Sequence, residues 1–276
     1  MILFSIPVHE NWFIVKNQID NILKYNPDSY IILHINPIFT CKCSISISIK
    51  NKVFINPTQI PYKQAKGLLD IHISNFLYME HLIDFNYFVL LSSNEMFIKG
   101  GLKDFIHTHK NGVQLVKFDK NNNWHLFHRH VENNLHIKQM LQFINMETLY
   151  GGQAEGQFYE THVFNIIVWI YHMFFNSYTW FENGFENEEI IPQTIFKSLG
   201  INHVRPITLQ NYCNPIEFTP KTIQNIINND ILIPDHGLRP GTLTCPHVNN
   251  SCLNIYSIKR VERKFNGLRL YINNLI

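Results

Sequence analysis

The chain has 276 residues, of which 45% are hydrophobic and 16% are charged, and its formal net charge is +2 at pH 7. This balance excludes wholesale disorder and is typical of a globular protein with a substantial core. The small net charge gives no reason to expect a nucleic-acid binder, so any effect of charge must come from its local placement.

Cysteine usage and hydropathy favour a soluble, cytoplasmic protein with at most peripheral membrane contact. The five cysteines are an odd number, and only Cys41 and Cys43 lie close together. This pattern suits free thiols in a reducing compartment better than a disulfide framework. The chain begins with a strand-like pattern instead of a signal peptide, and its most apolar stretch, 163–175, is too short to cross a bilayer.

The first 36 residues predict a strand, a helix and a second strand. Ile2–Val8 and Tyr30–Ile35 are strand-like, and Trp12–Tyr25 carries apolar residues at helical spacing. Such a βαβ unit has parallel strands and starts an α/β sheet. Residues 41–49 alternate Ser and Ile, which predicts an edge strand or hairpin, and 53–56 adds a short strand.

A turn and a long helix over 57–80 lead to a central strand at 87–91, which is apolar throughout and reads as buried on both faces. Ligands of open α/β sheets bind beyond the carboxyl ends of such strands. The polar residues that follow are therefore candidates for substrate contacts: Ser92, Ser93, Asn94 and Glu95. The alternative is that Ser93 or Asn94 caps a helix that follows the strand.

Later segments continue the α/β pattern within one domain. We expect a helix at 102–108, a strand at 113–118, a buried helix at 161–175 and a helix at 188–199 closed by Gly200. From residue 201 onward the chain is rich in proline and reads as a loop-rich C-terminal extension. No linker or repeat divides the chain, so we predict a single domain over 1–276.

Two polar segments lie between these elements. Residues 119–148 are dense in Asn and His, and His128 and His130 could share a strand face as metal ligands, or the loop could line a sugar pocket. No cysteine or carboxylate at a recognisable spacing completes a usual metal set. In 150–159, glycines flank Gln153 and Glu155, which indicates either backbone close to a ligand or tight turns.

An acidic and a basic cluster are the other candidates for chemistry. Glu188 and Glu189 start a predicted helix, where the helix dipole favours carboxylates, yet repulsion among neighbouring acids can also raise a pKa and prepare a general base. The tail gathers Lys259, Arg260, Arg263 and Lys264, which form either a solvated helix face partnered by Glu262 or a clamp on a diphosphate. No Asp-x-Asp occurs in the chain, so an enzyme using a nucleotide diphosphate would need fixed cations to stabilise the leaving group.

The order of elements resembles that of the core-2/I-branching β-1,6-N-acetylglucosaminyltransferases and the related xylosyltransferases, glycosyltransferase family 14. The first strand ends in His9, and the second ends in His34-Ile35-Asn36, where the family has His-Val-Asp. Residues 87–99 resemble the family's Tyr-Phe-Ile-Asn-Leu-Ser/Cys-Gly-x-Asp-Phe-Pro-Ile-Lys, with Glu95 in place of Asp and Phe97 in place of Pro. These departures, with Asn36, bear on which nucleotide and sugar are bound more than on the fold.

Two further motifs extend the resemblance over most of the chain. The segment 156–159 is similar to a glycine-containing segment of the family, and 187–194 is similar to Ser-Pro-Asp-Glu-x-x-x-Ala-Thr, which places Glu189 on the family's catalytic base. Near the family's C-terminus an Arg and a Lys contact the diphosphate in place of a metal, and the cluster 259–264 is similarly placed. The family's Golgi anchor and cysteine pairs have no counterpart in this chain.

The resemblance implies an α/β, GT-A-like glycosyltransferase: a single Rossmann-like domain with a mixed central sheet. Residues 1–120 would bind the nucleotide sugar, and 121–276 would bind the acceptor and carry the catalytic base and the basic tail. The implied reaction is inverting and metal-independent, with no cofactor, and moves a GlcNAc- or xylose-type sugar from a UDP-sugar to a hydroxyl of an oligosaccharide or glycoconjugate.

Glu189 would be the base in that reaction. The implied donor site comprises His9, Asn11, Asn36, Ser92, Ser93, Lys259, Arg260 and Arg263. The implied acceptor or sugar site comprises Asn94, Glu95, Glu155, Trp124 and Trp180. A non-catalytic glycan-binding protein on the same fold is the alternative, and nucleic-acid binding through the basic tail is a weaker one, which a steep salt dependence would reveal.

Overall fold

The computed structural model describes residues 1–37, 51–60, 67–118, 131–175, 186–210, 218–228, 255–259, 261–265 and 267–275. The predicted strand at 41–49, residues 119–130 of the histidine-rich segment with Trp124 and His128, and also Trp180 and Arg260, lie outside these residues. The loop expected over the rest of that segment is wrong, because residues Leu135–Phe143 form a helix.

The fold is built on a mixed five-stranded sheet with the strand order β3-β2-β1-β4-β8. The strands are β1 (Ile2–Val8), β2 (Tyr30–Ile35), β3 (Val53–Ile55), β4 (Tyr87–Leu90) and β8 (Phe158–Glu160). Strands β3, β2, β1 and β4 are parallel, and β8 is antiparallel to β4. The predicted α/β class with a mixed central sheet is therefore confirmed.

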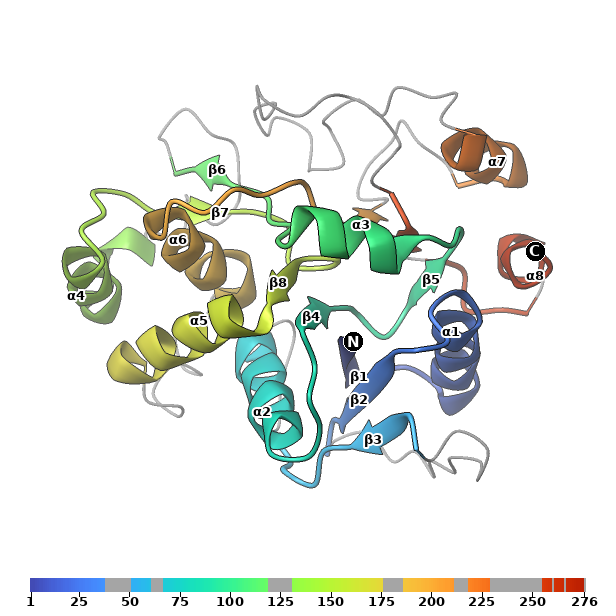
Figure 1. Ribbon diagram of the computed structural model, residues 1–276, viewed down its shortest axis with the longest axis horizontal. Coiled ribbons are helices and arrows are strands. Elements are labelled where there is room, and N and C mark those ends of the chain that lie inside the picture. Colours follow the sequence, from blue (N-terminus) through green and yellow to red (C-terminus); the bar gives the residue numbers. More distant parts are fainter. Residues whose placement is uncertain are drawn as a thin grey trace.

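Helices cover both faces of this sheet (Figure 1). On one face, α1 (Trp12–Tyr25) and α3 (Leu102–His109) pack in a core that includes Phe4. On the other, α2 (Leu68–Glu80) and α5 (Thr161–Phe174) pack in a core that includes Phe88. The bounds of β1, α1 and β2 agree with the sequence pattern, because Asn11 caps α1 and the polar turn after Tyr25 ends it.

A second, three-stranded sheet lies beyond the carboxyl end of β4. It has the order β5-β10-β9, where β5 is Glu95–Phe97, β9 is Thr208–Gln210 and β10 is Ser257–Lys259. β10 runs antiparallel to β5 and parallel to β9. Within the described residues, the expected loop-rich extension is therefore partly wrong, because the C-terminal part supplies the central strand of this sheet, followed by α8 (Gly267–Asn273).

The remaining elements surround the two sheets. They are β6 (Val116–Lys117), the 3-10 turn η3 (Val131–Asn133), α4 (Leu135–Phe143), β7 (Tyr150–Gly151), the 3-10 turn η4 (Asn187–Glu189), α6 (Ile191–Ser198) and α7 (Pro220–Asn228). The strand predicted at 113–118 is thus reduced to two residues that pair with β7.

The helix predicted at 188–199 begins later than expected, at Ile191. Pro192 explains the difference, because it stands in the first turn of α6, where its missing N–H is tolerated. A helix begun at Glu188 would place Pro192 in its interior. Gly200 follows the helix with φ 65°, as expected of a residue that closes a helix.

In the described part of the chain, no helix has both the length and the apolar character needed to cross a bilayer.

Candidate functional site

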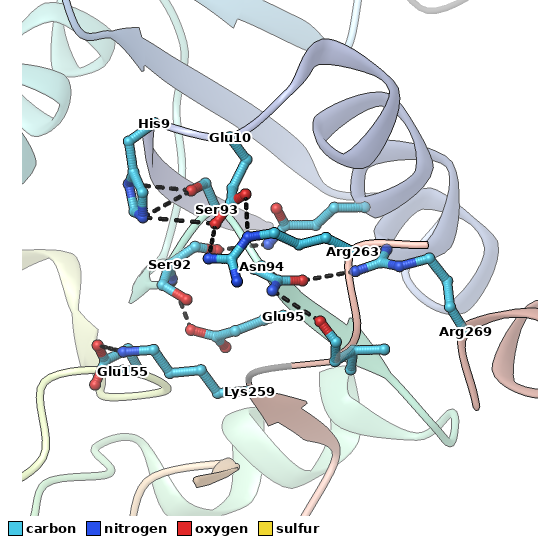
Figure 2. A network of polar contacts seen from close by, with 12 residues as sticks. His9, Glu10, Ser92, Ser93, Asn94, Glu95, Glu155, Lys259, Arg263 and Arg269 are labelled. Carbon is cyan, nitrogen blue, oxygen red and sulfur yellow. Dashed lines mark hydrogen bonds and ion pairs between the residues drawn. The ribbon is translucent and has the colours of Figure 1, made fainter. Parts of the chain in front are cut away.

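A network of polar side chains occupies the carboxyl edge of the parallel sheet, where β1 and β4 end (Figure 2). The loop after β4 turns directly into β5, so the expected alternative, in which Ser93 or Asn94 caps a following helix, is wrong. The carboxyl group of Glu95 accepts a hydrogen bond from the Ser92 backbone N–H through Oε1 at 2.6 Å, and through Oε2 it accepts one from Thr208 Oγ1 at 2.9 Å. Glu95 therefore shapes the loop and ties β5 to β9.

Glu95 is almost fully buried, with 1% of its surface exposed. Burial, and next the charge of nearby Glu155, raise the pKa of the Glu95 carboxyl to about 8. The group therefore holds its proton at neutral pH. A neutral Glu95 can donate one hydrogen bond as well as accept them.

Lys259 stands at the end of β10, in register with Glu95 on β5. Its ammonium forms an ion pair with Glu155, which lies in the loop between β7 and β8, and the two side chains are only 15% and 14% exposed. Gly156 follows Glu155 with φ 75°, and a Cβ at this position would collide with Thr208. A glycine is thus required for the loop to bring Glu155 to Lys259.

Arg263 makes a two-pronged contact with Glu10, the second residue after β1. Nε donates to Oε2 at 2.7 Å and Nη2 donates to Oε1 at 2.5 Å. Glu10 is buried, but the Arg263 side chain is 66% exposed and faces solvent from the rim of the network. Beside them, Ser93 Oγ lies 3.1 Å from His9 Nδ1, and burial is the main cause that lowers the pKa of His9.

A buried arginine, Arg269 of α8, holds the C-terminal segment in place. Its guanidinium donates to Asn94 Oδ1 at 2.6 Å and to Asn17 Oδ1 at 2.8 Å, while Asn94 Nδ2 donates to the Val261 carbonyl at 2.8 Å. Burial lowers the pKa of Arg269 to about 10, so it remains charged at neutral pH. Both polar atoms of the Asn94 side chain are thus used to hold the C-terminal segment, and the predicted contact of Asn94 with a sugar would have to be made in addition to these hydrogen bonds.

The basic cluster is not the helix face considered from the sequence. Lys259 belongs to a strand, Arg263 lies in the bend after it, and α8 begins only at Gly267. Lys259 therefore contacts the loop before β8, and Arg263 contacts the loop after β1.

The acidic pair occupies the turn η4 instead of the first turn of a helix. Glu188 is 3% exposed, and burial, followed by the charge of Glu189, raises its pKa well above the usual value. The charge of nearby Glu155 also raises the pKa of Glu188. Glu189 is half-buried, and its carbonyl accepts a hydrogen bond from Gly152 N–H at 2.9 Å.

The other predicted donor residues lie at the same edge of the sheet. Asn11 follows β1 and uses its side-chain oxygen to cap α1, accepting from Phe13 N–H at 2.9 Å. Asn36 follows β2, is 8% exposed, and its N–H donates to the Val8 carbonyl at 3.2 Å.

Sequence reasoning missed several residues of the network, among them Glu10, Asn17, Thr208 and Arg269. A weak signal existed for Arg269, which is the one charged residue in the apolar run of α8. Glu10 adjoins His9 but gains its role only from Arg263. In the described ranges, no three His, Cys, Asp or Glu side chains are grouped so that they could hold a metal ion.

Comparisons with known proteins give a distant likeness of fold. No family of proteins matches the chain by sequence, and no curated protein does. Similar solved structures include a 4-diphosphocytidyl-2C-methyl-D-erythritol synthase, with a TM-score of 0.40 and 8% identity over 82% of this chain and 97% of that one. They also include the galactosyltransferase LgtC in complex with donor and acceptor sugar analogs, with a TM-score of 0.42 and 10% identity over 95% of this chain and 87% of that one.

A third similar structure is a nucleoside-diphosphate-sugar pyrophosphorylase from Vibrio cholerae RC9, with a TM-score of 0.41 and 6% identity over 74% of this chain and 91% of that one. Similarity at this level does not identify the reaction.

Proposed function

We propose that this protein is a glycosyltransferase of the GT-A type that moves a sugar from a nucleotide diphosphate donor to a hydroxyl group of a glycan. One observation carries the proposal: two cations from one C-terminal segment lie at this edge, where Arg263 contacts Glu10 after β1 and Lys259 contacts Glu155 in the loop before β8. The carboxyl edge of a parallel sheet is where α/β proteins bind nucleotides, and lysine and arginine are the side chains that bind phosphate groups.

The reaction would be a single inverting displacement. Glu189 accepts the proton of the acceptor hydroxyl, and the hydroxyl oxygen attacks the anomeric carbon of the donor. The bond from that carbon to the diphosphate breaks, and its electron pair leaves with the diphosphate. Lys259 and Arg263, with Arg260, stabilise the new negative charge; removal of one such contact typically raises the barrier by about 3 kcal/mol.

This arrangement would dispense with a divalent metal ion because fixed cations neutralise the diphosphate. The resemblance of the sequence motifs supports a UDP-sugar of the GlcNAc or xylose type as donor. It also supports a sugar position near Ser92, Ser93 and Glu155. Glu95 would contribute as a neutral carboxyl that fixes the loop.

The role of Glu189 as base can be tested by mutation, with the adjacent Glu188 as the matched control. We expect Glu189→Gln to lower the transfer rate by roughly a hundredfold or more, because the base is removed, while nucleotide binding is kept. Glu188→Gln should retain transfer, because burial raises the pKa of Glu188 and so favours its neutral form, which glutamine resembles. Transfer would be measured with a panel of UDP-sugars, and the same assay in EDTA should show no loss.

Full turnover by the Glu189→Gln enzyme would remove Glu189 from this role. Dependence of the rate on Mn²⁺ would contradict the metal-independent mechanism.

A non-catalytic glycan-binding protein is the second candidate, and the ion pairs favour it in one respect. Both cations are partnered by carboxylates, Lys259 by Glu155 and Arg263 by Glu10, so their charges are compensated within the protein. Calorimetry with UDP separates the two candidates. A protein that only binds glycans would show no affinity for the nucleotide.

A further inference from the structure

The turn η4, which carries Glu189, is tied to the helices α2 and α5 by two side-chain hydrogen bonds. Tyr171 of α5 donates its hydroxyl proton to Asp70 Oδ1 at 2.7 Å, and Asn187 Nδ2 donates to the Tyr171 hydroxyl oxygen at 3.2 Å. The helices α2 and α5 share one hydrophobic core (Figure 1), and η4 packs against α2. A continuous chain of hydrogen bonds therefore leads from the first turn of α2 to the first residue of η4.

These polar groups lie in surroundings that are otherwise apolar. Tyr171 is 1% exposed and Asn187 is 4% exposed, and burial raises the pKa of both the Asp70 carboxyl and the Tyr171 hydroxyl. A phenylalanine at position 171 would fill nearly the same space without the cost of burying a hydroxyl group. Hydrogen bonds require a defined distance and angle, so this chain fixes the position of η4 more closely than apolar packing alone would.

The opposite side of η4 is held through its backbone. The Glu189 carbonyl accepts from Gly152 N–H at 2.9 Å, and the Glu188 carbonyl accepts from the buried Gln193 Nε2 at 2.9 Å. Gly152 directly follows β7 and belongs to the loop that also carries Glu155. The backbone of Glu189 is thus fixed between α5 on one side and this loop of the polar network on the other.

We propose that Tyr171 and Asp70 are positioning residues for the proposed transfer reaction, because they hold η4 so that the Glu189 carboxylate reaches the acceptor hydroxyl. They act through η4 and do not contact the substrate. The inference rests on the proposed function, since it needs Glu189 as the base. A general base must lie within hydrogen-bond distance of the proton that it accepts, so a small shift of η4 slows the chemical step. Donor binding through Lys259 and Arg263 is left unchanged by such a shift.

The variant Tyr171→Phe removes the hydroxyl group and both of its hydrogen bonds but keeps the ring in the core. We expect kcat to fall roughly tenfold with the UDP-sugar that the wild type uses best, while KM for this donor and Kd for UDP stay unchanged. Tyr87→Phe is the matched control. Tyr87 is also buried, and its hydroxyl lies 3.2 Å from His107 Nδ1 and accepts from Lys110 Nζ at 3.1 Å. It stands at the start of β4, at the opposite edge of the sheet, so its loss should not change kcat.

Two substitutions of Asp70 separate positioning from a general loss of packing. Asparagine keeps the oxygen that accepts from Tyr171, whereas leucine has a similar size but no acceptor. Asp70→Asn should therefore recover most of the rate that Asp70→Leu loses. Tyr171→Phe combined with Asp70→Leu should cost little more than either change alone, because both break the same chain of hydrogen bonds.

Circular dichroism and urea melts of each variant check that the fold is kept. The inference is overturned if Tyr171→Phe turns over at the wild-type rate, or if KM or the Kd for UDP rises as much as kcat falls. It is also overturned if Tyr87→Phe or Asp70→Asn loses as much rate as Tyr171→Phe. Failure of the proposed function gives a different result: the wild type itself would transfer no sugar from any donor in the panel, which would refute that function and this inference with it.

Discussion

Replacing Glu155 by glutamine should make the protein bind pyrophosphate and UDP more tightly. The Glu155 carboxylate forms an ion pair with the Lys259 ammonium, where we place the diphosphate of the donor. The anion must therefore displace an internal competitor of the same charge. Glutamine removes that charge and also the repulsion between Glu155 and the incoming anion, while it keeps the size of the side chain.

The magnitude follows from the setting of the ion pair. Two unit charges about 4 Å apart attract by at most about 4 kcal/mol at the effective dielectric constant near a protein surface. The side chains are 15% and 14% exposed, so the cost of removing both charges from water offsets a large part of this attraction. We therefore expect the binding free energy of the anion to be about 1.4 kcal/mol more favourable in Glu155→Gln, which corresponds to a roughly tenfold lower Kd.

Titration calorimetry with pyrophosphate and with UDP would measure this change. Asp28→Asn is the control, because Asp28 pairs with Lys103 at 3.0 Å on the exposed surface and should leave both affinities unchanged. If Glu155→Gln binds the anions no more tightly than the wild type, Lys259 does not receive the diphosphate. If neither the wild type nor the Glu155→Gln variant binds pyrophosphate or UDP, the proposed function is refuted.

Two predictions concern stability. Folded Glu95 holds its proton up to about pH 8, whereas the unfolded chain releases it near the ordinary value of 4.5, so the free energy of unfolding should fall as pH rises between these values. The loss approaches about 5 kcal/mol above the folded pKa, and Glu95→Gln should flatten the dependence in urea melts at a series of pH values; an unchanged slope would refute the assigned cause. Gly156→Ala should destabilise the protein by on the order of 3 kcal/mol because of its positive φ and the collision with Thr208, whereas Gly100→Ala, which meets no atom within 4 Å, should be neutral. Equal stability of the two variants in chemical denaturation would contradict this account of the loop.

The parts of the fold that the sequence predicts are those set by local patterns. The strands and helix of the first 36 residues follow from uninterrupted apolar spacing and from the polar residues that bound α1. The sheet β5-β10-β9 was missed because each strand has only three residues, which is too short for a recognisable alternation, and the strands come from distant parts of the chain.

The candidate site also has a part that local sequence predicts and a part that depends on tertiary contacts. The loop at 92–95 was predicted because it follows a buried strand directly, and the network includes all four of its residues. The burial of Glu10 and the partners of Arg269 were not predictable, because they depend on which distant side chains the fold brings together. The same limit applies to Glu188, whose burial distinguishes it from the adjacent Glu189 only once η4 and α2 pack together.

The contact between Glu10 and Arg263 joins residues 253 positions apart in the sequence. In an unfolded chain, closing a flexible loop of this length costs roughly 5 kcal/mol of chain entropy, so we expect such a contact to form late in folding and to open early. The parallel sheet could then persist while β10 and α8 detach, and the molecule would keep its shape but lose both cations. Capacity to hold an anion would thus report that the last stage of folding is complete, and hydrogen exchange should find α8 less protected than β1.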